Sequence, residues 1–349
     1  MNLDGKRVII VAGSGGVGKT TPSAALALRL AAAGRRVAVV TIDPARRLAA
    51  ALGMDELGNE PRHVEGIELQ GELHAMQLDA KRTFDELIER LAPDERAAKE
   101  VLGNRIYREL SGAMTGSQEF TAVAKLYELH RDERYDVVVL DTPPSRNALD
   151  FLDAPDRLTG FLDGRALQAL LAPTGLAARI VGRGTGVVFS ALSRITGIDL
   201  LADLSVFFRS LTGLIEGFRR RAAGVKELLG DPATTFLIVT SPEREPVEEA
   251  LFFHGRLRDA GMPFGGLIVN RVHSAPDADV AGLDATLGER LAGKVGETLR
   301  DLRVLADRDA AAIELLKREL WLRDPVLVPL LDHDVHDVEG LALLQRHLG

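Results

Sequence analysis

A glycine-rich segment near the start of the chain has the residue types and spacing of a phosphate-binding loop. Gly13 is followed, after four residues, by Gly18-Lys19-Thr20, which satisfies the pattern G-x-x-x-x-G-K followed by S or T. Glycines let backbone N–H groups turn toward a phosphate with no Cβ in the way. Lys19 can reach the β- and γ-phosphates of a nucleotide, and the Thr20 hydroxyl can hold Mg²⁺. We therefore predict nucleotide binding by Gly13, Ser14, Gly15, Gly16, Val17, Gly18, Lys19, Thr20 and Thr21.

The segments on either side of this loop are those that a phosphate loop needs. Residues 8–12 form a short apolar, β-branched run that predicts a buried strand, and residues 24–33 have the alanine- and leucine-rich period of a helix. The N-terminus of that helix adds a partial positive charge beside the loop. A second apolar run at residues 37–42 completes a βαβ unit. This order predicts a parallel sheet with its ligand at the carboxyl edge.

Two carboxylates follow predicted strands at that edge. Asp43 stands directly after the run 37–42 and before Pro44. It either faces the nucleotide and orients a water molecule, or it caps a turn, and the spacing alone leaves both interpretations open. Asp141 ends the buried run 137–140, which is the Walker B pattern. We therefore predict that Asp141 holds Mg²⁺, mainly through water.

The middle of the chain has a different residue pattern from the segments on either side. Residues 150–230 carry apolar residues at helical period and no strand signal, which predicts an all-helical insertion. Its helices either pack on the core or expose an apolar surface to a partner or client. Strand patterns resume at 234–240, 265–271 and 326–331. The predicted fold is an α/β P-loop NTPase with a doubly wound, mainly parallel sheet, whose core comprises 1–149 and 231–349 around the helical subdomain 150–230.

Composition and charge exclude several classes of function. The formal net charge of −8 over 349 residues argues against nucleic acid or an anionic membrane as the main partner. Because the chain has no cysteine, it can form no disulfide, thiolate metal site or catalytic thiol. The apolar run before the phosphate loop is too short for a signal peptide. We expect a cytoplasmic protein, with association at the inner membrane through a partner as a further hypothesis.

Six motifs along the chain together resemble the arsenical-pump ATPase (ArsA) family. In order they are Gly13–Thr21, Thr41–Ala45, Met114–Glu119, Asp141–Ser145, Val269–Arg271 and Val328–Leu331. The resemblance covers nearly the whole chain and is most like the actinobacterial branch. The same family includes the ATPases that guide tail-anchored membrane proteins.

The resemblance implies a role for each motif. Asp43, with Pro44 and Ala45, looks like the switch I segment whose carboxylate positions the attacking water. Asp141, Thr142, Pro143 and Pro144 look like switch II, and Asn270, Arg271, Pro329 and Leu330 look like the border of the adenine. The family resemblance further implies a deviant Walker A (SIMIBI-like) ATPase that binds ATP and Mg²⁺ and closes as a dimer around nucleotide. In such proteins the helical subdomain forms the client groove.

Ser14 stands where the family usually has a signature lysine that reaches across the dimer to the partner's phosphates. A hydroxyl cannot supply that charge, so a weak homodimeric ATPase or a heterodimer with a lysine-bearing paralogue is expected. Alternatively, Arg46, Arg47 or Arg146 supplies the charge. The missing cysteines also exclude thiolate binding of arsenite and the zinc-binding pair that the eukaryotic targeting factors carry.

The sequence thus predicts a Mg²⁺-dependent ATPase whose dimer closure and opening control a region that binds a hydrophobic client or a membrane-associated partner. One alternative is a poorly hydrolysing regulatory subunit of a heterodimer. A second is a partition- or positioning-type ATPase, which would need a basic surface or a terminal amphipathic anchor. No nucleic-acid partner is expected.

Overall fold

The computed structural model describes residues 1, 3–105, 107–108, 117–142, 160, 200–276, 287–331 and 333–348. The chain divides into two compact units. The first comprises Met1–Gln77, Leu129–Leu149 and Gly230–Gly349, and the second comprises Leu78–Glu128 and Asp150–Leu229.

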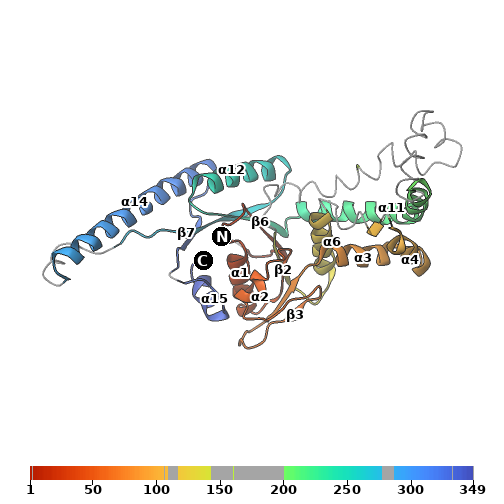
Figure 1. The fold of residues 1–349 in the computed structure, drawn as a ribbon, viewed down its shortest axis with the longest axis horizontal. Helices are drawn as coiled ribbons and strands as arrows, with labels where there is room; N and C mark the ends of the chain where they lie inside the picture. Colours follow the sequence, from red (N-terminus) through yellow and green to blue (C-terminus); the bar gives the residue numbers. More distant parts are fainter. Residues whose placement is uncertain are drawn as a thin grey trace. The chain divides into compact units, whose positions relative to one another are not determined.

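The first unit is built on one eight-stranded sheet with the strand order β3-β4-β2-β5-β1-β6-β7-β8 (Figure 1). Its strands are β1 (Val8–Ala12), β2 (Arg36–Thr41), β3 (Arg62–His63), β4 (Glu72–Gln77), β5 (Val137–Asp141), β6 (Thr234–Thr240), β7 (Phe264–Val272) and β8 (Val326–Pro329). Every neighbouring pair is parallel except β3 and β4, which are antiparallel. The predicted α/β class with a mainly parallel sheet is confirmed.

The central strand β1 carries the phosphate loop at its carboxyl end. It pairs with β5 on one side, where Val11 stands opposite Asp141, and with β6 on the other, where Val11 stands opposite Leu237. All five residues of β1 are buried. Strands buried on both faces read as continuous apolar runs, which is why this one could be found in the sequence.

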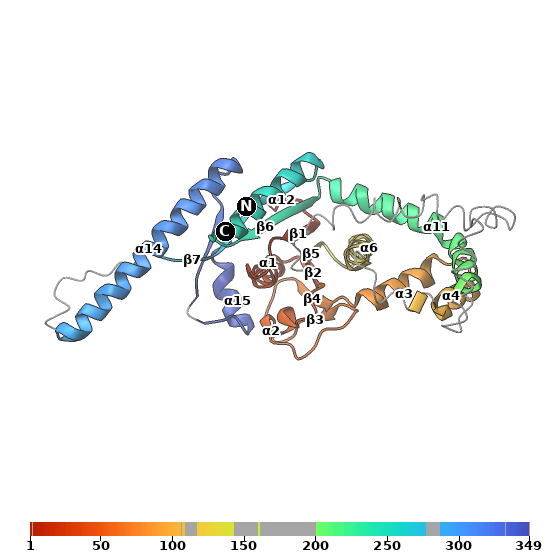
Figure 2. The same ribbon diagram turned by 45° about the horizontal axis from the view of Figure 1, so that its top comes forward.

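The sheet is covered by helices α1 (Thr20–Ala32), α2 (Arg47–Ala51), α12 (Arg244–Asp259), α14 (Glu289–Glu319) and α15 (Val338–Gln345). Helix α1 begins directly after the phosphate loop, and its alanine-rich face is buried in the main apolar core. Helix α15 packs against α1 (Figure 2). The guanidinium of Arg29 in α1 also donates a hydrogen bond to the Leu348 carbonyl oxygen at 2.9 Å. These contacts hold α1, the helix that follows the phosphate loop, within the first unit.

The described residues of the second unit lie in helices and the turns that join them. These helices are α3 (Ala80–Leu91), α4 (Glu95–Gly103), α6 (Ser117–Arg131), whose last residues belong to the first unit, and α11 (Leu200–Gly230). Phe84 stacks on both Tyr107 and Phe218. Gly224 of α11 lies so close to α6 that a Cβ there would be 2.9 Å from the Tyr127 ring. Aromatic packing and close helix approach hold this unit together.

The predicted helical insertion at 150–230 is described only at residue 160 and in α11. Residues 114–116 of the Met114–Glu119 motif, Pro143, Pro144 and Arg146 also lie outside the described residues. The second unit takes in Leu78–Glu128, which the sequence analysis placed in the first part of the core. The boundaries of the helical subdomain therefore stay a prediction. Within the described helices, none has a stretch long and apolar enough to cross a membrane.

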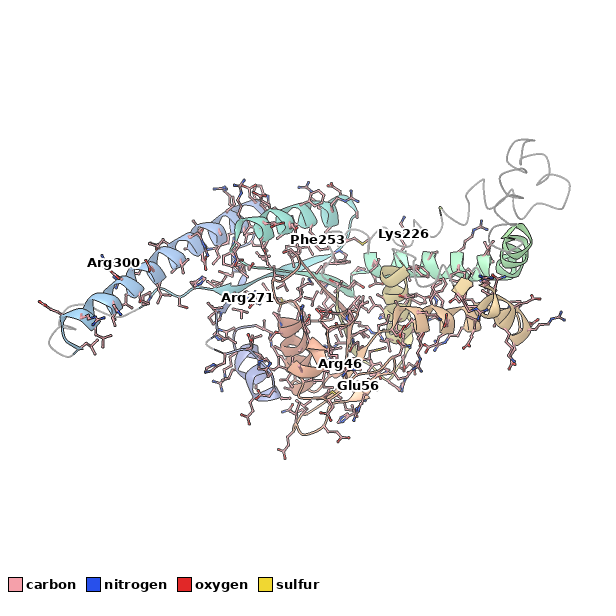
Figure 3. The ribbon with its side chains drawn as sticks, in the orientation of Figure 1. Arg46, Glu56, Lys226, Phe253, Arg271 and Arg300 are labelled. Carbon is pink, nitrogen blue, oxygen red and sulfur yellow. The ribbon has the colours of Figure 1, made fainter. Side chains whose placement is uncertain are left out.

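Adjacent phenylalanines on α12 allow a matched test of the core. Phe253 is 5% exposed and lies on the side of α12 toward the sheet (Figure 3), whereas Phe252 is 61% exposed. We expect Phe253→Ala to lower the free energy of unfolding by about 3–5 kcal/mol, because it leaves a cavity in a packed core. Phe252→Ala should stay within about 0.5 kcal/mol of the wild type. Urea denaturation of both variants checks this. Equal losses of unfolding free energy in the two variants would contradict the burial of Phe253 and the exposure of Phe252.

Candidate functional site

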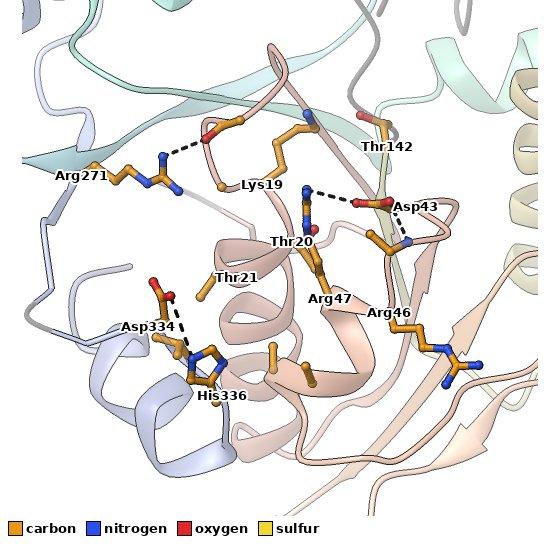
Figure 4. Close-up of a pocket in the computed structure, with 16 residues that line it drawn as sticks. Lys19, Thr20, Thr21, Asp43, Arg46, Arg47, Thr142, Arg271, Asp334 and His336 are labelled. Carbon is orange, nitrogen blue, oxygen red and sulfur yellow. Dashed lines mark hydrogen bonds and ion pairs between the residues drawn. The ribbon is translucent and has the colours of Figure 1, made fainter.

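A cavity of about 520 Å³ opens in the first unit at the carboxyl ends of the sheet strands (Figure 4). Among the sequence-predicted site residues, those that line it are Gly16, Gly18, Lys19, Thr20, Thr21, Asp43, Ala45, Thr142 and Arg271. Arg46 and Arg47 line it as well. Residues far apart in the sequence are thus brought to one place, as the βαβ pattern requires.

The backbone of the phosphate loop needs glycine at three positions. A Cβ on Gly13 would lie 2.0 Å from the Val239 carbonyl oxygen, and one on Gly18 would lie 2.6 Å from the Asn270 Nδ2. Gly16 and Gly18 also have φ of 81° and 80°, a left-handed conformation that residues with a Cβ rarely adopt. This tight, glycine-dependent path is the kind of cradle that a phosphate group fits.

The ammonium group of Lys19 folds back over the loop. Its Nζ donates hydrogen bonds to the carbonyl oxygens of Gly13 and Ser14, both at 2.9 Å. Burial lowers the pKa of Lys19, and the nearby carboxylates of Asp141 and Asp43 oppose that shift. Lys19 is therefore held by neutral acceptors, which an anionic phosphate can replace.

Asp141 is a buried carboxylate held by hydroxyl groups. Its Oδ2 accepts from Thr20 Oγ1 at 2.8 Å and from Thr41 Oγ1 at 2.9 Å, and its Oδ1 lies 3.3 Å from Ser23 Oγ. Burial raises the pKa of Asp141 to about 6, although these hydrogen bonds and Lys19 oppose the rise. The sequence analysis missed Thr41 and Ser23. Only their positions in the sequence could have indicated them. Thr41 is at the end of β2, and Ser23 is four residues after Lys19 in α1.

Thr20 and Asp141 fit the predicted magnesium role in different ways. Because Thr20 gives its proton to Asp141, its oxygen lone pairs remain available, and Thr20 lines the cavity. Asp141 does not line it, which suits contact through water. Within the described residues, no group of three or more histidine or carboxylate side chains could hold a metal alone. Magnesium would therefore take further oxygen ligands from phosphates and water.

Asp43 both caps a turn and lines the cavity, and its role in orienting water stays a prediction. Its Oδ1 accepts a hydrogen bond from the Ala45 N–H at 2.9 Å, so it caps its own turn. It also lines the cavity, and its Oδ2 lies 3.3 Å from Arg47 NH1. The neighbouring Arg46 has a left-handed φ of 51° and makes only a loose ion pair with Glu56, at 3.8 Å (Figure 3).

The end of β7 holds the phosphate loop from outside. Asn270 Nδ2 donates to the Val17 carbonyl oxygen at 2.8 Å, and Arg271 NH1 donates to the Gly16 carbonyl oxygen at 2.9 Å. The predicted role of both residues at the adenine stays a prediction.

Pro329 and Leu330, the other predicted adenine neighbours, do not line the cavity. The Leu330 N–H donates to the Val272 carbonyl oxygen at 2.9 Å, and its side chain is exposed. Beyond them, Asp334, Val335 and His336 line the cavity. The sequence analysis missed this segment. The one feature of the sequence that could have indicated it is its position after the last strand.

Ser14 occupies the position discussed for a signature lysine. Its hydroxyl oxygen is buried and has no hydrogen-bond partner among the described residues. Its carbonyl oxygen, in contrast, accepts from Lys19. Ser14 thus shapes the loop through its backbone and brings no charge to it.

The family follows from comparison with known proteins. The model of the family described as anion-transporting ATPase (ArsA) matches residues 6–290. The chain belongs to the ArsA family. This confirms the family resemblance, and the family is one of ATPases.

Three relatives of this ArsA-family chain are similar over most of its length. A protein of Aquifex aeolicus named arsenical pump-driving ATPase 1 is 29% identical over 281 residues, covering 76% of this chain and 63% of its own. The ATPase ASNA1 homolog of Cryptosporidium parvum is 28% identical over 269 residues, with 76% and 64% covered. ATPase GET3 of Malassezia globosa is 26% identical over 341 residues, with 97% and 90% covered. The chain therefore spans less than two thirds of the first two relatives.

The buried Asp141 should make stability depend on pH. Because burial raises its pKa from 3.8 to about 6, the native state binds more protons than the unfolded state between these values. Its contribution to stability is therefore lost as the pH rises through this window. Asp141→Asn lacks the ionisation. We expect its free energy of unfolding, relative to the wild type, to rise by roughly 2–3 kcal/mol from pH 4 to pH 7. Urea denaturation at several pH values checks this, and a constant difference would contradict it.

Proposed function

We propose that this chain is a Mg²⁺-dependent ATPase whose ATP binding and hydrolysis drive closure and opening with a second ATPase subunit. One observation supports the enzymatic part most directly. A single cavity is lined by the phosphate-loop Lys19, the hydroxyl of Thr20 and the carboxylate of Asp43. These are the groups that phosphoryl transfer to water needs: a cation for the phosphates, a metal ligand and a group to orient water.

Catalysis would come from positioning and electrostatic stabilisation. Lys19 would leave the carbonyl oxygens of its own loop and bind the β- and γ-phosphates, together with the loop N–H groups. Thr20 would hold Mg²⁺ directly, and Asp141 would contact it through a water molecule. Bound Mg²⁺ would neutralise phosphate charge. Asp43 would orient the attacking water, and Asn270 and Arg271 would border the adenine.

The output would be a change of conformation. The segments that begin at Asp43 and Asp141 come from neighbouring strands, since Thr41 of β2 stands opposite Asp141 of β5. Loss of the terminal phosphate would release both segments, as in other nucleotide switches. By resemblance to the ArsA family, we propose that the helical region responds by binding or releasing a hydrophobic client or a membrane-associated partner.

The second subunit would be another copy of this chain or a paralogous ATPase. Ser14 brings no charge to the site, so the partner or a local arginine must stabilise the transition state if turnover is fast. A homodimer would complete its own site and become more active as the protein concentration rises. A heterodimer would bind ATP here but turn over only with its paralogue.

Steady-state ATP hydrolysis and ATP binding, measured across a wide range of protein concentration, test this proposal. We expect Lys19→Ala to lose both ATP binding and hydrolysis. Asp43→Asn should keep ATP binding and lose at least about 100-fold in turnover, as removal of a residue that assists proton transfer typically does. Lys317→Ala removes a half-buried lysine that is paired with Glu314 on α14, far along the sequence from the predicted site residues, and it should match the wild type.

The concentration series separates the two kinds of dimer. Specific activity that rises with concentration would support a homodimer, and tight ATP binding with negligible turnover throughout would support a paralogous partner. Failure of the wild type to bind ATP would overturn the proposed function.

A further inference from the structure

Both carboxylate oxygens of Asp43 are engaged in this structure. Oδ1 accepts the Ala45 N–H at 2.9 Å, and Oδ2 faces Arg47 NH1 at 3.3 Å (Figure 4). A carboxylate that orients an attacking water needs an oxygen lone pair directed at that water, and a cation on the same oxygen competes with the water for it. The turn around Ala45 fixes the first oxygen through the backbone, so Arg47 is the group that competes with a water for the second.

The contact between Arg47 and Asp43 is easy to break. The Arg47 side chain is 62% exposed while that of Asp43 is 10% exposed, and a single NH1 contact joins them. Ion pairs with one such solvated partner contribute little to stability. Asp43, in contrast, is held firmly from its backbone side, because its carbonyl oxygen accepts from Gln77 Nε2 at 3.0 Å.

A triphosphate would offer Arg47 a better partner. Arg47 lines the same cavity as Lys19 and Thr20, which are the expected phosphate and metal ligands. A planar guanidinium can bind two oxygens of a phosphate through two N–H groups, and it does so more strongly than through one carboxylate oxygen. Lys19 is also held by groups of the chain itself, in its case the neutral carbonyl oxygens of Gly13 and Ser14, which a phosphate can replace.

We propose that Arg47 is a positioning residue that exchanges Asp43 for the terminal phosphate of a bound nucleoside triphosphate. This inference rests on the proposed ATPase function. Arg47 then leaves Oδ2 of Asp43 to the attacking water only when a terminal phosphate is present. A diphosphate leaves Arg47 on Asp43, so the site distinguishes the two nucleotides before any hydrolysis.

A purely structural role for Arg47 makes a different prediction. Arg47 and Asp43 are four residues apart at the start of α2, so their pair could simply stabilise that turn. In that case removing Arg47 would change the thermal stability and affect binding of both nucleotides alike. Selective loss of triphosphate binding separates the two roles.

The test measures binding of two nucleotides to the full-length chain by calorimetry in the presence of Mg²⁺. The probes are ADP and the non-hydrolysable ATP analogue AMP-PNP. We expect Arg47→Ala to weaken AMP-PNP binding about tenfold or more, which is the usual worth of a charge-assisted hydrogen bond, and to change ADP binding less than about twofold. Arg47→Lys keeps the positive charge but not the two parallel N–H groups of the guanidinium. It should therefore lose less AMP-PNP affinity than Arg47→Ala.

Arg82 provides the matched control. It is also 62% exposed, and it pairs with Glu86 four residues away, but it lies outside the cavity. Arg82→Ala should leave both affinities as in the wild type. Thermal melting of all variants identifies any that fail to fold, and Arg47→Lys then stands in for Arg47→Ala.

Asp43→Asn gives an independent readout of the exchange. It frees Arg47 from its carboxylate partner and should tighten AMP-PNP binding. Asp43→Asn made in the Arg47→Ala background is the control. It measures how much removing the negative charge of Asp43 changes AMP-PNP affinity when Arg47 is absent. We expect Asp43→Asn to increase AMP-PNP affinity by a factor about threefold larger in the wild-type background than in the Arg47→Ala background.

Each outcome has a separate meaning. Equal effects of Arg47→Ala on both nucleotides, no effect on either, or an Asp43→Asn gain that does not depend on Arg47 would overturn this inference. Such results with a wild type that binds and hydrolyses ATP would leave the proposed function intact. A wild type that binds neither nucleotide would overturn the proposed function itself.

Discussion

The arrangement of the site depends on one buried negative charge. Asp141 ends β5, and its oxygens are reached by Thr20 and Ser23 from α1 and by Thr41 from β2. A carboxylate taken out of water is costly unless hydrogen bonds replace its hydration. The Thr20 and Thr41 hydroxyls do so here, and the Ser23 hydroxyl, which also lies 2.9 Å from the Lys19 carbonyl oxygen, is a more distant neighbour. The position of α1, and therefore of the phosphate loop before it, is tied to the carboxyl ends of two neighbouring strands.

The parallel sheet explains why so few contacts can organise so much of the chain. Residues 12–20, 43, 142 and 271 follow or end four different strands, yet the common strand direction brings them to one edge. β1 is at the centre of this arrangement because it is paired on both sides. The segment after it is therefore bordered by β5 and β6, and the close approach of Gly13 to Val239 is a direct result.

Much of this first unit could be predicted from the sequence, because buried parallel strands and a phosphate loop leave strong local patterns. Thr41 and Ser23 could not be recognised, since a hydroxyl in a strand or helix has no pattern that reveals its partner. Asp334–His336 approach the cavity only through tertiary folding. The place of Leu78–Glu128 in the second unit depends on contacts such as Phe84 with Phe218, 134 positions apart, which no local signal predicts.

The hydrogen bonds from the end of β7 fix the direction of two peptide planes in the phosphate loop. Because a trans peptide is planar, its N–H points away from its C=O. Arg271 draws the Gly16 carbonyl outward and Asn270 draws the Val17 carbonyl outward. The N–H groups of Val17 and Gly18 must then face the other way. The loop's dipoles are thus oriented when the protein folds, so an arriving anion finds them in place and little further ordering of the backbone opposes its binding.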